Sequence, residues 1–445
     1  MRKLAGPALA GVLVMAAARS SDAQDRLTVD QAVQAALTHN ASLRAATAGV
    51  AEGEARVAEA RSGWFPRVSV AETWQRGDQP VFVFSSLLAA RRFGAANFAV
   101  DALNQPEPVG FFRTSIGIDQ MLFDGGEQRA AVDRARTERD IAQFSLDETR
   151  ARLAVSTTEI YGRALAAESS RRAAEAALEA ARHDRARARD RRDAGMATDA
   201  DVLALDAYVA SLEQRRVRHD GDAAIARADL NRLMGAPIDR AYLTVEPPVA
   251  TTDGSTSLDV AALLAEADAN RPEMHRASAA AKLARTERRR AGAPLMPRIA
   301  AQARVEMSGT GAADRASSWI VGAEARWSLS LGGAERARLK AAAAAGARAA
   351  AEADEARAAV HVDVVTALRR RESAVARLAA GRAAVVQARE TERIVRDRFE
   401  AGLASVTDLL RASTAVLDAD AERTAATVDA LVGDAQLKHA LGRRP

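Results

Sequence analysis

The sequence contains no cysteine, only 4% aromatic residues and almost no lysine, since arginine supplies most of its 63 basic residues. Without cysteine the chain cannot form disulfides, thiolate metal sites or a lipid anchor on an N-terminal cysteine. Beyond residue 23, no apolar run approaches the roughly 20 residues that a membrane-spanning helix needs. Any later membrane segment would therefore have to be a β-strand.

Patterns typical of catalysis or nucleic-acid binding are also missing. The six histidines are scattered, and His361 with Asp363 forms only a lone pair on a helix, which is more typical of a solvated face than of a metal site. No GKS/T phosphate loop occurs, and residues 124–126 (DGG) have the composition of a turn. The net charge is +4 with both signs interleaved, so no basic patch indicates nucleic acid. We therefore expect neither an enzyme nor a cofactor.

The N-terminus has the pattern of a secretory signal peptide. Arg2 and Lys3 precede an apolar run over residues 4–18, and residues 21–23 offer small side chains at the two positions that a signal peptidase reads. Cleavage is expected before Gln24, which makes residues 1–23 the signal peptide. The alternative, an uncleaved anchor helix, is disfavoured because the apolar run is shorter than a bilayer span.

The rest of the chain repeats itself once. Residues 189–198 (RDRRDAGMAT) reappear as residues 396–405 (RDRFEAGLAS), at an offset of 207 that also pairs Leu230 with Leu437. Further upstream the offset becomes 231, so the first half holds about 24 extra residues after Pro66. The resulting division has a first repeat, a linker and a second repeat, at 24–235, 236–257 and 258–445.

Each repeat contains a segment without proline that is too long for a globular core. Residues 126–192 would form a helix about 100 Å long, and residues 333–400 match them. Apolar residues recur in both at coiled-coil spacing, as they do in the following shorter helices, so the helices are expected to pack on one another. These seams contain Leu146, Leu153, Ile160, Val202, Leu205, Val209, Leu212, Val364, Leu368, Val375, Leu378 and Val385.

Shorter helices are predicted over residues 28–62, 198–235, 258–292 and 405–442. Capping pairs open three of them, namely Thr28 with Gln31, Thr198 with Asp201 and Ser405 with Asp408. Gly195 and Gly402 precede the second and fourth, where a left-handed residue ends the long helix. Two short helices placed end to end equal one long helix in length, so each repeat would supply one continuous and one broken rod.

Four stretches of about ten residues have the alternation of membrane β-strands. They lie at about 67–75, 113–123, 297–307 and 319–331, and the last two are the clearer pair, apolar on one face and charged on the other. Ten of the 17 aromatic residues lie between Trp64 and Phe123, as expected where interface belts form. A soluble, half-buried hairpin is the alternative reading of these segments.

Four strands cannot close a barrel, and lipid does not tolerate open sheet edges. Two copies would give eight strands and a filled interior, whereas three copies give twelve and leave room for a lumen. A conduit therefore favours a homotrimer, with a mainly α fold of long helical hairpins and a β-barrel segment.

With these features the chain resembles the TolC-type outer-membrane efflux proteins over essentially its whole mature length. The resemblance is carried by the opening LTVDQA at 27–32, the strand-to-helix turn LFDGG at 122–126, the duplicated Ala-Gly helix-tip turns and the closing Leu441-Gly442. It implies a trimer with a twelve-strand barrel in the outer membrane and a periplasmic tunnel of helical rods. It also implies that a periplasmic adaptor and an inner-membrane pump are the partners of a passive exit duct for efflux or type I secretion.

The resemblance also assigns roles at the helix tips. In the best-known members two acids three residues apart face the pore; here the first is Asp408, and Arg411 replaces the second. Asp201 matches their first-half acidic partner, so Asp408, Arg411 and Asp201 form the implied constriction. In the same members a Tyr and an Arg hold the tip in its resting state. They correspond to Phe399 and Ala404 here, so that resting-state contact is absent.

Other positions are structural candidates. The turns at Gly195, Thr198, Gly402 and Ser405 are candidate adaptor-docking points. The strand–helix junctions are expected at Pro66, Pro297, Gly125, Gly126, Gly332 and Gly333. An equatorial collar is expected to come mainly from 236–257. The competing class is a periplasmic adaptor or structural coiled-coil protein, which would share the long hairpins but not the full duplication or the four strands.

Overall fold

The computed structural model describes residues 26–248, 259–311 and 313–443. The expected signal peptide, 1–23, and part of the linker 236–257 lie outside the described residues. The chain divides into two compact units. The tip unit comprises Met1–Thr38, Thr157–Thr251 and Arg377–Leu431, and the sheet unit comprises His39–Ser156, Thr252–Ala376 and Val432–Pro445. Two helices of 67 residues each, α5 (Glu127–Asp193) and α9 (Ala334–Glu400), contribute to both units.

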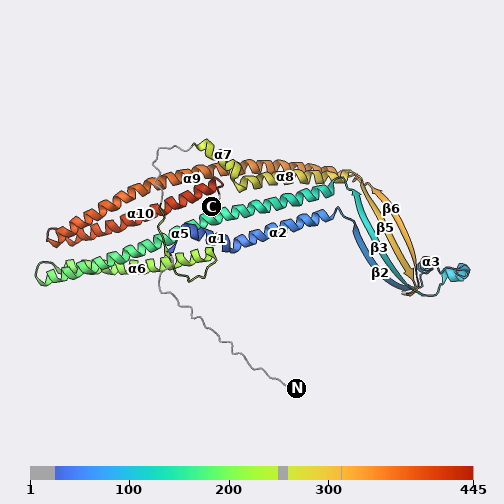
Figure 1. The fold of residues 1–445 in the computed structure, drawn as a ribbon, viewed down its shortest axis with the longest axis horizontal. Helices are drawn as coiled ribbons and strands as arrows, with labels where there is room; N and C mark the ends of the chain where they lie inside the picture. Colours follow the sequence, from blue (N-terminus) through green and yellow to red (C-terminus); the bar gives the residue numbers. More distant parts are fainter. Residues whose placement is uncertain (1–25, 249–258, 312, 444–445) are drawn as a thin grey trace, which may run out of the picture. The chain divides into compact units, whose positions relative to one another are not determined.

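The sheet unit is built on one four-stranded antiparallel sheet (Figure 1). Its order is β2-β3-β5-β6, and the strands run Arg67–Gly77, Val109–Phe123, Arg298–Gly309 and Arg315–Arg326. The central pair, β3 and β5, joins the first half of the chain to the second. Strands β2 and β6 are the edges, and within the described ranges each pairs with one other strand.

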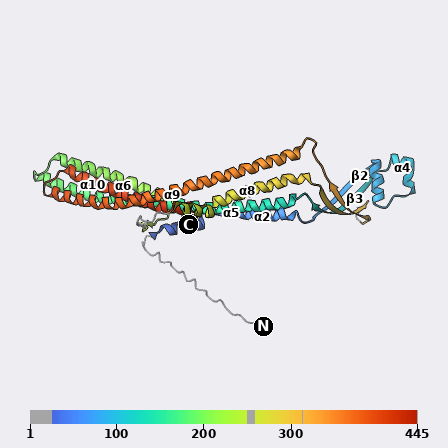
Figure 2. The same ribbon diagram turned by 90° about the horizontal axis from the view of Figure 1, so that it is seen from above.

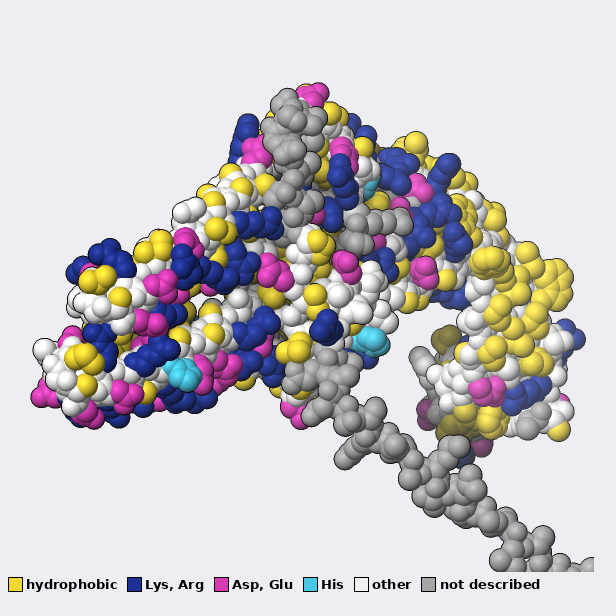
Figure 3. All heavy atoms as spheres, turned by 60° about the vertical axis from the view of Figure 1, so that its left-hand side comes forward, with side chains coloured by type: hydrophobic (Ala, Val, Ile, Leu, Met, Phe, Trp, Pro, Cys, Tyr) yellow, Lys and Arg dark blue, Asp and Glu magenta, His cyan; other side chains and the backbone are white. Residues whose placement is uncertain are grey.

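The register puts most of the large apolar residues of the four strands on one face. Val70 lies opposite Ile116, Ile116 opposite Val305, and Val305 opposite Trp319. Large apolar side chains on this face are exposed, Val70 by 70% and Trp319 by 78%. Figure 3 shows hydrophobic side chains gathered on the right, where the sheet lies. The opposite face carries polar residues such as Gln302, Arg304 and Glu306. An amphipathic sheet of this length suits lipid on one side and water on the other.

Helices continue from the inner ends of these strands. In the sheet unit α2 (Ala41–Ser62) lies along α5, and α8 (Pro272–Gly292) lies along α5 as well, with Arg276 3.3 Å from Glu148. Toward the sheet α9 separates from α8 (Figure 2). A short helix, α7 (Val260–Asn270), precedes α8, and the turn η2 (Ala293–Leu295) follows it. A buried cluster from α7, α9, α10 and the residue after α10 includes Leu263, Val364, Leu368, Leu437 and Leu441.

The tip unit consists mainly of helical hairpins. α6 (Asp199–Met234) follows α5, and α10 (Val406–Ala440) follows α9. The seams predicted from the sequence are buried: Leu205, Leu212 and Leu378 are each at most 1% exposed. Val375 is the one predicted seam residue that is only half-buried. Apolar spacing along a helix is thus sufficient to locate its packed face.

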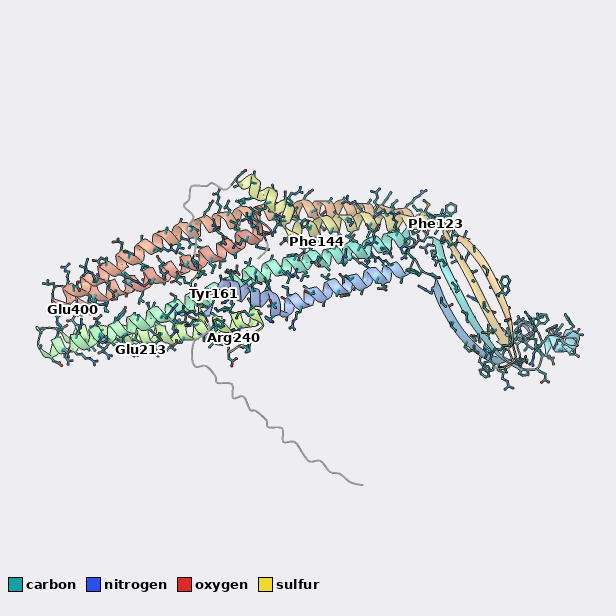
Figure 4. The ribbon with its side chains drawn as sticks, in the orientation of Figure 1. Phe123, Phe144, Tyr161, Glu213, Arg240 and Glu400 are labelled. Carbon is teal, nitrogen blue, oxygen red and sulfur yellow. The ribbon has the colours of Figure 1, made fainter. Side chains whose placement is uncertain are left out.

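A small clasp fixes the start of the chain to α5. β1 (Arg26–Leu27) pairs in parallel with β4 (Leu243–Thr244), within the linker segment that was expected to form a collar. The fully buried Tyr161 hydroxyl lies 2.8 Å from the carbonyls of Leu27 and Val245, and it accepts the Val245 N–H at 3.0 Å (Figure 4). One α5 side chain therefore holds both strands.

Two of the predicted short helices are broken. The segment predicted as one helix over 28–62 is α1 (Val29–His39) and α2, separated by Asn40; the segment 258–292 is α7 and α8, separated by Arg271. Asn40 has extended backbone (ψ 133) and accepts the Ser42 N–H, which restarts the chain as a capped helix. Arg271 precedes Pro272, whose ring excludes helical backbone at the preceding residue.

Two other segments differ in detail from the alternation in the sequence. β6 lies earlier along the chain than the predicted stretch 319–331, and residues 327–331 are not in a strand. The 24-residue excess of the first half folds largely as helix, with α3 (Pro80–Ala89), η1 (Ala95–Phe98) and α4 (Val100–Asn104). Within residues 26–248, 259–311 and 313–443, none of the helices combines the length and apolar character that crossing a membrane requires.

Candidate functional site: the two helix tips

The first helix tip ends α5 and starts α6. Gly195 has φ +75, and the N–H groups of Gly195 and Met196 donate to the carbonyls of Arg192 and Arg191 at 2.8 and 2.7 Å. This is the Schellman geometry that favours glycine. Thr198 and Asp201 then form a reciprocal capping box, in which the carboxylate accepts from the Thr198 N–H at 3.0 Å and from its hydroxyl at 2.8 Å.

The second tip repeats this geometry at the offset of 207. Gly402 has φ +78 and donates to the Phe399 carbonyl at 3.0 Å. The Asp408 carboxylate accepts from the Ser405 N–H at 3.2 Å and from its hydroxyl at 2.7 Å. These bonds from Ser405, with a smaller contribution from the Arg411 charge, hold the pKa of Asp408 below its usual value.

The tip unit brings the two turns together. A buried cluster joins Val202 and Leu205 of α6 to Phe399, Val406 and Leu409 of the second tip. The Arg191 guanidinium donates to the Phe399 carbonyl at 2.7 Å and lies 5.5 Å from the centre of the Phe399 ring. Arg187 pairs with Glu400, the last residue of α9 (Figure 4).

These contacts give Phe399 a role that the sequence did not indicate. The resemblance identified Phe399 only as a position where the resting-state contact of the tip is missing. In the structure it is a buried residue that receives a cation from the other tip. Arg191 was also missed, although it lies inside the repeated segment that identified the tips.

Beside the tips, the helices of the tip unit enclose a groove of about 570 Å³. Polar groups lie along it: Arg396 contacts Asp184 at 3.5 Å and Glu392 at 3.0 Å, and Ser413 donates to Glu392 at 2.8 Å. Asp184 is 93% buried by area, its side chain pointing among helices, and this burial raises its pKa despite the neighbouring Arg396. The groove is thus polar and charged rather than a closed apolar cavity.

The three residues of the implied constriction lie in the first turns of the helices that follow the tips. The carboxylates of both Asp201 and Asp408 are engaged in capping, and both remain accessible to solvent. Arg411 is exposed one turn further along α10. A carboxylate that caps a helix keeps its charge, so capping and attraction of cations from a pore are compatible.

The remaining candidates lie at the strand–helix junctions of the sheet unit. Pro66 and Pro297 immediately precede β2 and β5. Gly125 has φ +69, and a Cβ there would lie 2.5 Å from the Ala293 carbonyl oxygen, so the close approach also requires glycine. Gly126 and Gly333 have φ +88 and +73 in the turns that open α5 and α9, whereas Gly332 has no such backbone requirement.

Comparison with solved structures shows the same fold. The chain matches the outer membrane protein VceC from Vibrio cholerae with a TM-score of 0.76 at 20% identity, covering 93% of this chain and 96% of that one. It matches the Campylobacter jejuni CmeC outer membrane channel with a TM-score of 0.78 at 13% identity, covering 93% and 85%. It matches the Neisseria gonorrhoeae MtrE outer membrane channel, captured in an open state, with a TM-score of 0.73 at 18% identity, covering 93% of this chain and 89% of that one. No curated protein sequence matches the chain.

The amphipathic sheet, the paired long helices and the duplicated tips define the class of outer-membrane channel proteins. The sequence profile of the outer membrane efflux proteins matches residues 32–236 and 263–443. The chain belongs to the outer membrane efflux protein family. It is an exit duct for efflux that lies in the outer membrane and extends long helices into the periplasm.

Proposed function

We propose that three copies of this chain form one channel, which receives its cargo from an inner-membrane pump through a periplasmic adaptor. The observation that carries the trimer is the pair of open sheet edges. Among the residues that the structure describes, β2 and β6 each have a strand partner on one side of their backbone only. Lipid does not satisfy such groups, so β2 of one copy must pair with β6 of another.

The helices supply a second argument for assembly. In the tip unit α6 exposes Leu203, Val217 and Ile225, and α9 exposes Val386 and Ile394. These side chains recur at near-heptad intervals on faces that the protomer does not cover. Packing α6 of one copy against α9 of the next would bury both stripes in the manner of the seams inside the protomer.

The tips are the proposed docking point for the adaptor. Both turns are exposed, both are rigidly closed by Schellman bonds and capping boxes, and Gly195 has open space around the position of a Cβ. A helical hairpin of a partner can approach such a turn closely because glycine presents only backbone. The groove with Asp184, Glu392 and Arg396 lies alongside and offers charged contacts.

The narrow end of the tunnel is proposed to be lined by Asp201, Asp408 and Arg411. Three copies of each acid would attract cations. Arg411, one turn from Asp408, would offset part of that charge, so this constriction is expected to be less cation-selective than a ring with two acids per copy.

The experiment that tests the proposal combines Gly195→Leu with Gly402→Leu. Both substitutions place a branched side chain at positive φ on the exposed turns, and export of the cargo should be lost while trimer yield is kept. The matched control is Gly221→Leu in α6, which like Gly195 has open space but has a helical backbone, and export should survive; at Gly402 a Cβ would lie 3.2 Å from Arg191 Nη2. Trimer is measured by heat-modifiable migration of purified outer membranes. A soluble periplasmic monomer would instead support the adaptor class, and normal export by the double variant would remove the docking role.

A further inference from the structure

The first hairpin carries an insert that the second hairpin lacks. Residues 78–108 connect β2 to β3 and contain α3, η1 and α4, whereas residues 310–314 suffice to connect β5 to β6. The insert has a small aromatic centre of its own, since Phe93 lies 4.5 Å from Phe84 and 5.0 Å from Phe98 between ring centroids. It is therefore a folded element and not a simple turn.

The base of the insert covers the polar face of the sheet. A Cβ at Gly77, which lies on that face, would be 3.7 Å from the Phe82 ring. Phe111 and Ser308 lie on the same face at the same end of the sheet, and both are only 2% exposed. Further along this face Gln302 and Arg304 are exposed. In a membrane sheet the polar face borders the channel, so the insert lies on the channel side.

Two arginines tie the insert to the second hairpin. The Arg91 guanidinium donates to the Ser317 carbonyl at 3.0 Å, and Arg92 bonds the Thr310 hydroxyl and pairs with Asp314. Arg91 occupies the left-handed region at φ 55, where glycine would be the unstrained choice. An arginine at this position supplies a side chain that reaches β6. We call Arg91 and Arg92 the latch.

The outer surface of the insert stays uncovered in a single chain. Val81, Phe98 and Val100 are 73%, 65% and 71% exposed, and α3 contains no charged residue. In the proposed trimer the polar faces of three sheets surround one axis, so three inserts face one another across it. Contact between them would remove these side chains from water.

We propose that residues 78–108 form a lid over the channel mouth, held to each sheet by the latch and closed by contact with the lids of the other two copies. This inference rests on the proposed trimer. It assigns the apolar surface of the insert to a second and third copy of the same chain. It also predicts that the mouth opens when the latch is broken.

Removing the lid is the first test. Gly77 and Val109 are direct partners in the register, so Asn-Gly can replace residues 78–108 as a two-residue hairpin turn. Purified trimers in planar bilayers should show a several-fold higher single-channel conductance or open fraction than the wild type. Unchanged conductance in intact trimers would overturn the lid. Absence of trimers in the wild type as well would instead refute the proposed function.

Breaking only the latch is the second test. Arg91→Gly suits the backbone while it removes the side chain, and it is combined with Arg92→Gln. Cells with this variant should take up vancomycin, a large hydrophilic antibiotic, at least a few-fold faster. The control is Arg76→Gln, the loss of an exposed arginine from the opposite face of β2. Equal uptake by the latch variant and the control would exclude the latch.

The third test addresses contact between lids. Because the chain has no cysteine, Val100→Cys introduces a single thiol. Oxidation should cross-link copies within one trimer and lower the conductance, and a reductant should reverse both effects. Failure of Val100→Cys and of Phe98→Cys to cross-link intact trimers would show that the lids do not meet.

Discussion

The two halves of the chain build their helix tips alike but their helix junctions differently. Where α1 meets α2, the short Asn40 side chain accepts from the Ser42 N–H and hydroxyl at 2.9 and 2.6 Å. At the corresponding break between α7 and α8, Arg271 makes no cap and instead reaches Glu273 at 2.9 Å and Asp363 at 3.2 Å. One junction is closed by a local hydrogen bond, the other by one ion pair within α8 and one to the neighbouring helix α9.

This difference shows which part of a duplicated design is constrained. A tip must reverse the chain within a few residues, and few sequences other than a left-handed glycine followed by a capping box can do so. A junction needs only one extended residue. Asparagine achieves this by capping, and arginine before proline achieves it by exclusion of the helical backbone.

The largest loss of stability is expected from Gly442→Ala. Gly442 packs against Asn270 and Arg271, where α7 meets α8. Gly442 has φ +68, and a Cβ there would lie 2.6 Å from the Asn270 carbonyl carbon. Left-handed strain and overpacking together should lower the free energy of unfolding by about 2–5 kcal/mol. Gly346→Ala, with open space in α9, should raise it by up to about 1 kcal/mol. Urea titration followed by circular dichroism measures both, and equal effects would contradict the steric argument.

Next is Arg271→Met, set against Asn40→Ala. Arg271 is 3% exposed, and its removal leaves Glu273 and Asp363 without their partner, which should cost about 2–4 kcal/mol. Loss of the Asn40 cap should cost about 1 kcal/mol. The comparison between junctions fails if the two substitutions destabilise equally in the same titration.

A smaller, functional effect separates the tips. Asp201 is followed one turn later by Ala204, whereas Asp408 is followed by Arg411. Asp201→Asn should therefore reduce cation preference in planar bilayers more than Asp408→Asn, because no arginine offsets the first charge. An amide still accepts the capping bond, so stability should change less than the loss of about 1 kcal/mol expected for Ser405→Ala. Unchanged selectivity with a loss equal to that of Ser405→Ala would leave Asp408 only a cap.

The smallest effect is a dependence on pH confined to the second junction. Burial, with the charge of Arg271, lowers the pKa of His439 below its usual 6.5. The unfolded chain therefore binds this proton more readily, so stability present above pH 6.5 is lost as the pH falls from there through the folded pKa. His439→Gln should flatten the change in melting temperature between pH 7 and 5. The first half has no histidine at the corresponding position, which is Arg232.

Much of this architecture could be predicted from the sequence because it follows from periodicity. The long rods, the buried seams at Leu205 and Leu378 and the four amphipathic strands are local patterns repeated over many residues. The breaks at Asn40 and Arg271 were missed because a single extended residue hardly disturbs a 35-residue pattern. The contacts of Arg191 with Phe399 and of Arg91 with Ser317 could not be predicted, since they join residues that are over 200 positions apart.

The pairing of β3 with β5 has a consequence for symmetry. Each repeat contributes two strands to the sheet, so three chains together contain six repeats. If the repeats were separate, identical chains, six of them would form a ring with sixfold symmetry. The covalent link between repeats reduces the formal symmetry of the proposed assembly from sixfold to threefold. Once the two repeats are no longer identical by symmetry, a change in one is not copied around the whole ring. Only in a ring of that lower symmetry can the first hairpin of each chain carry a lid that the second hairpin lacks. In the same way, Asp408 can have a neighbouring arginine, Arg411, while Asp201 has none.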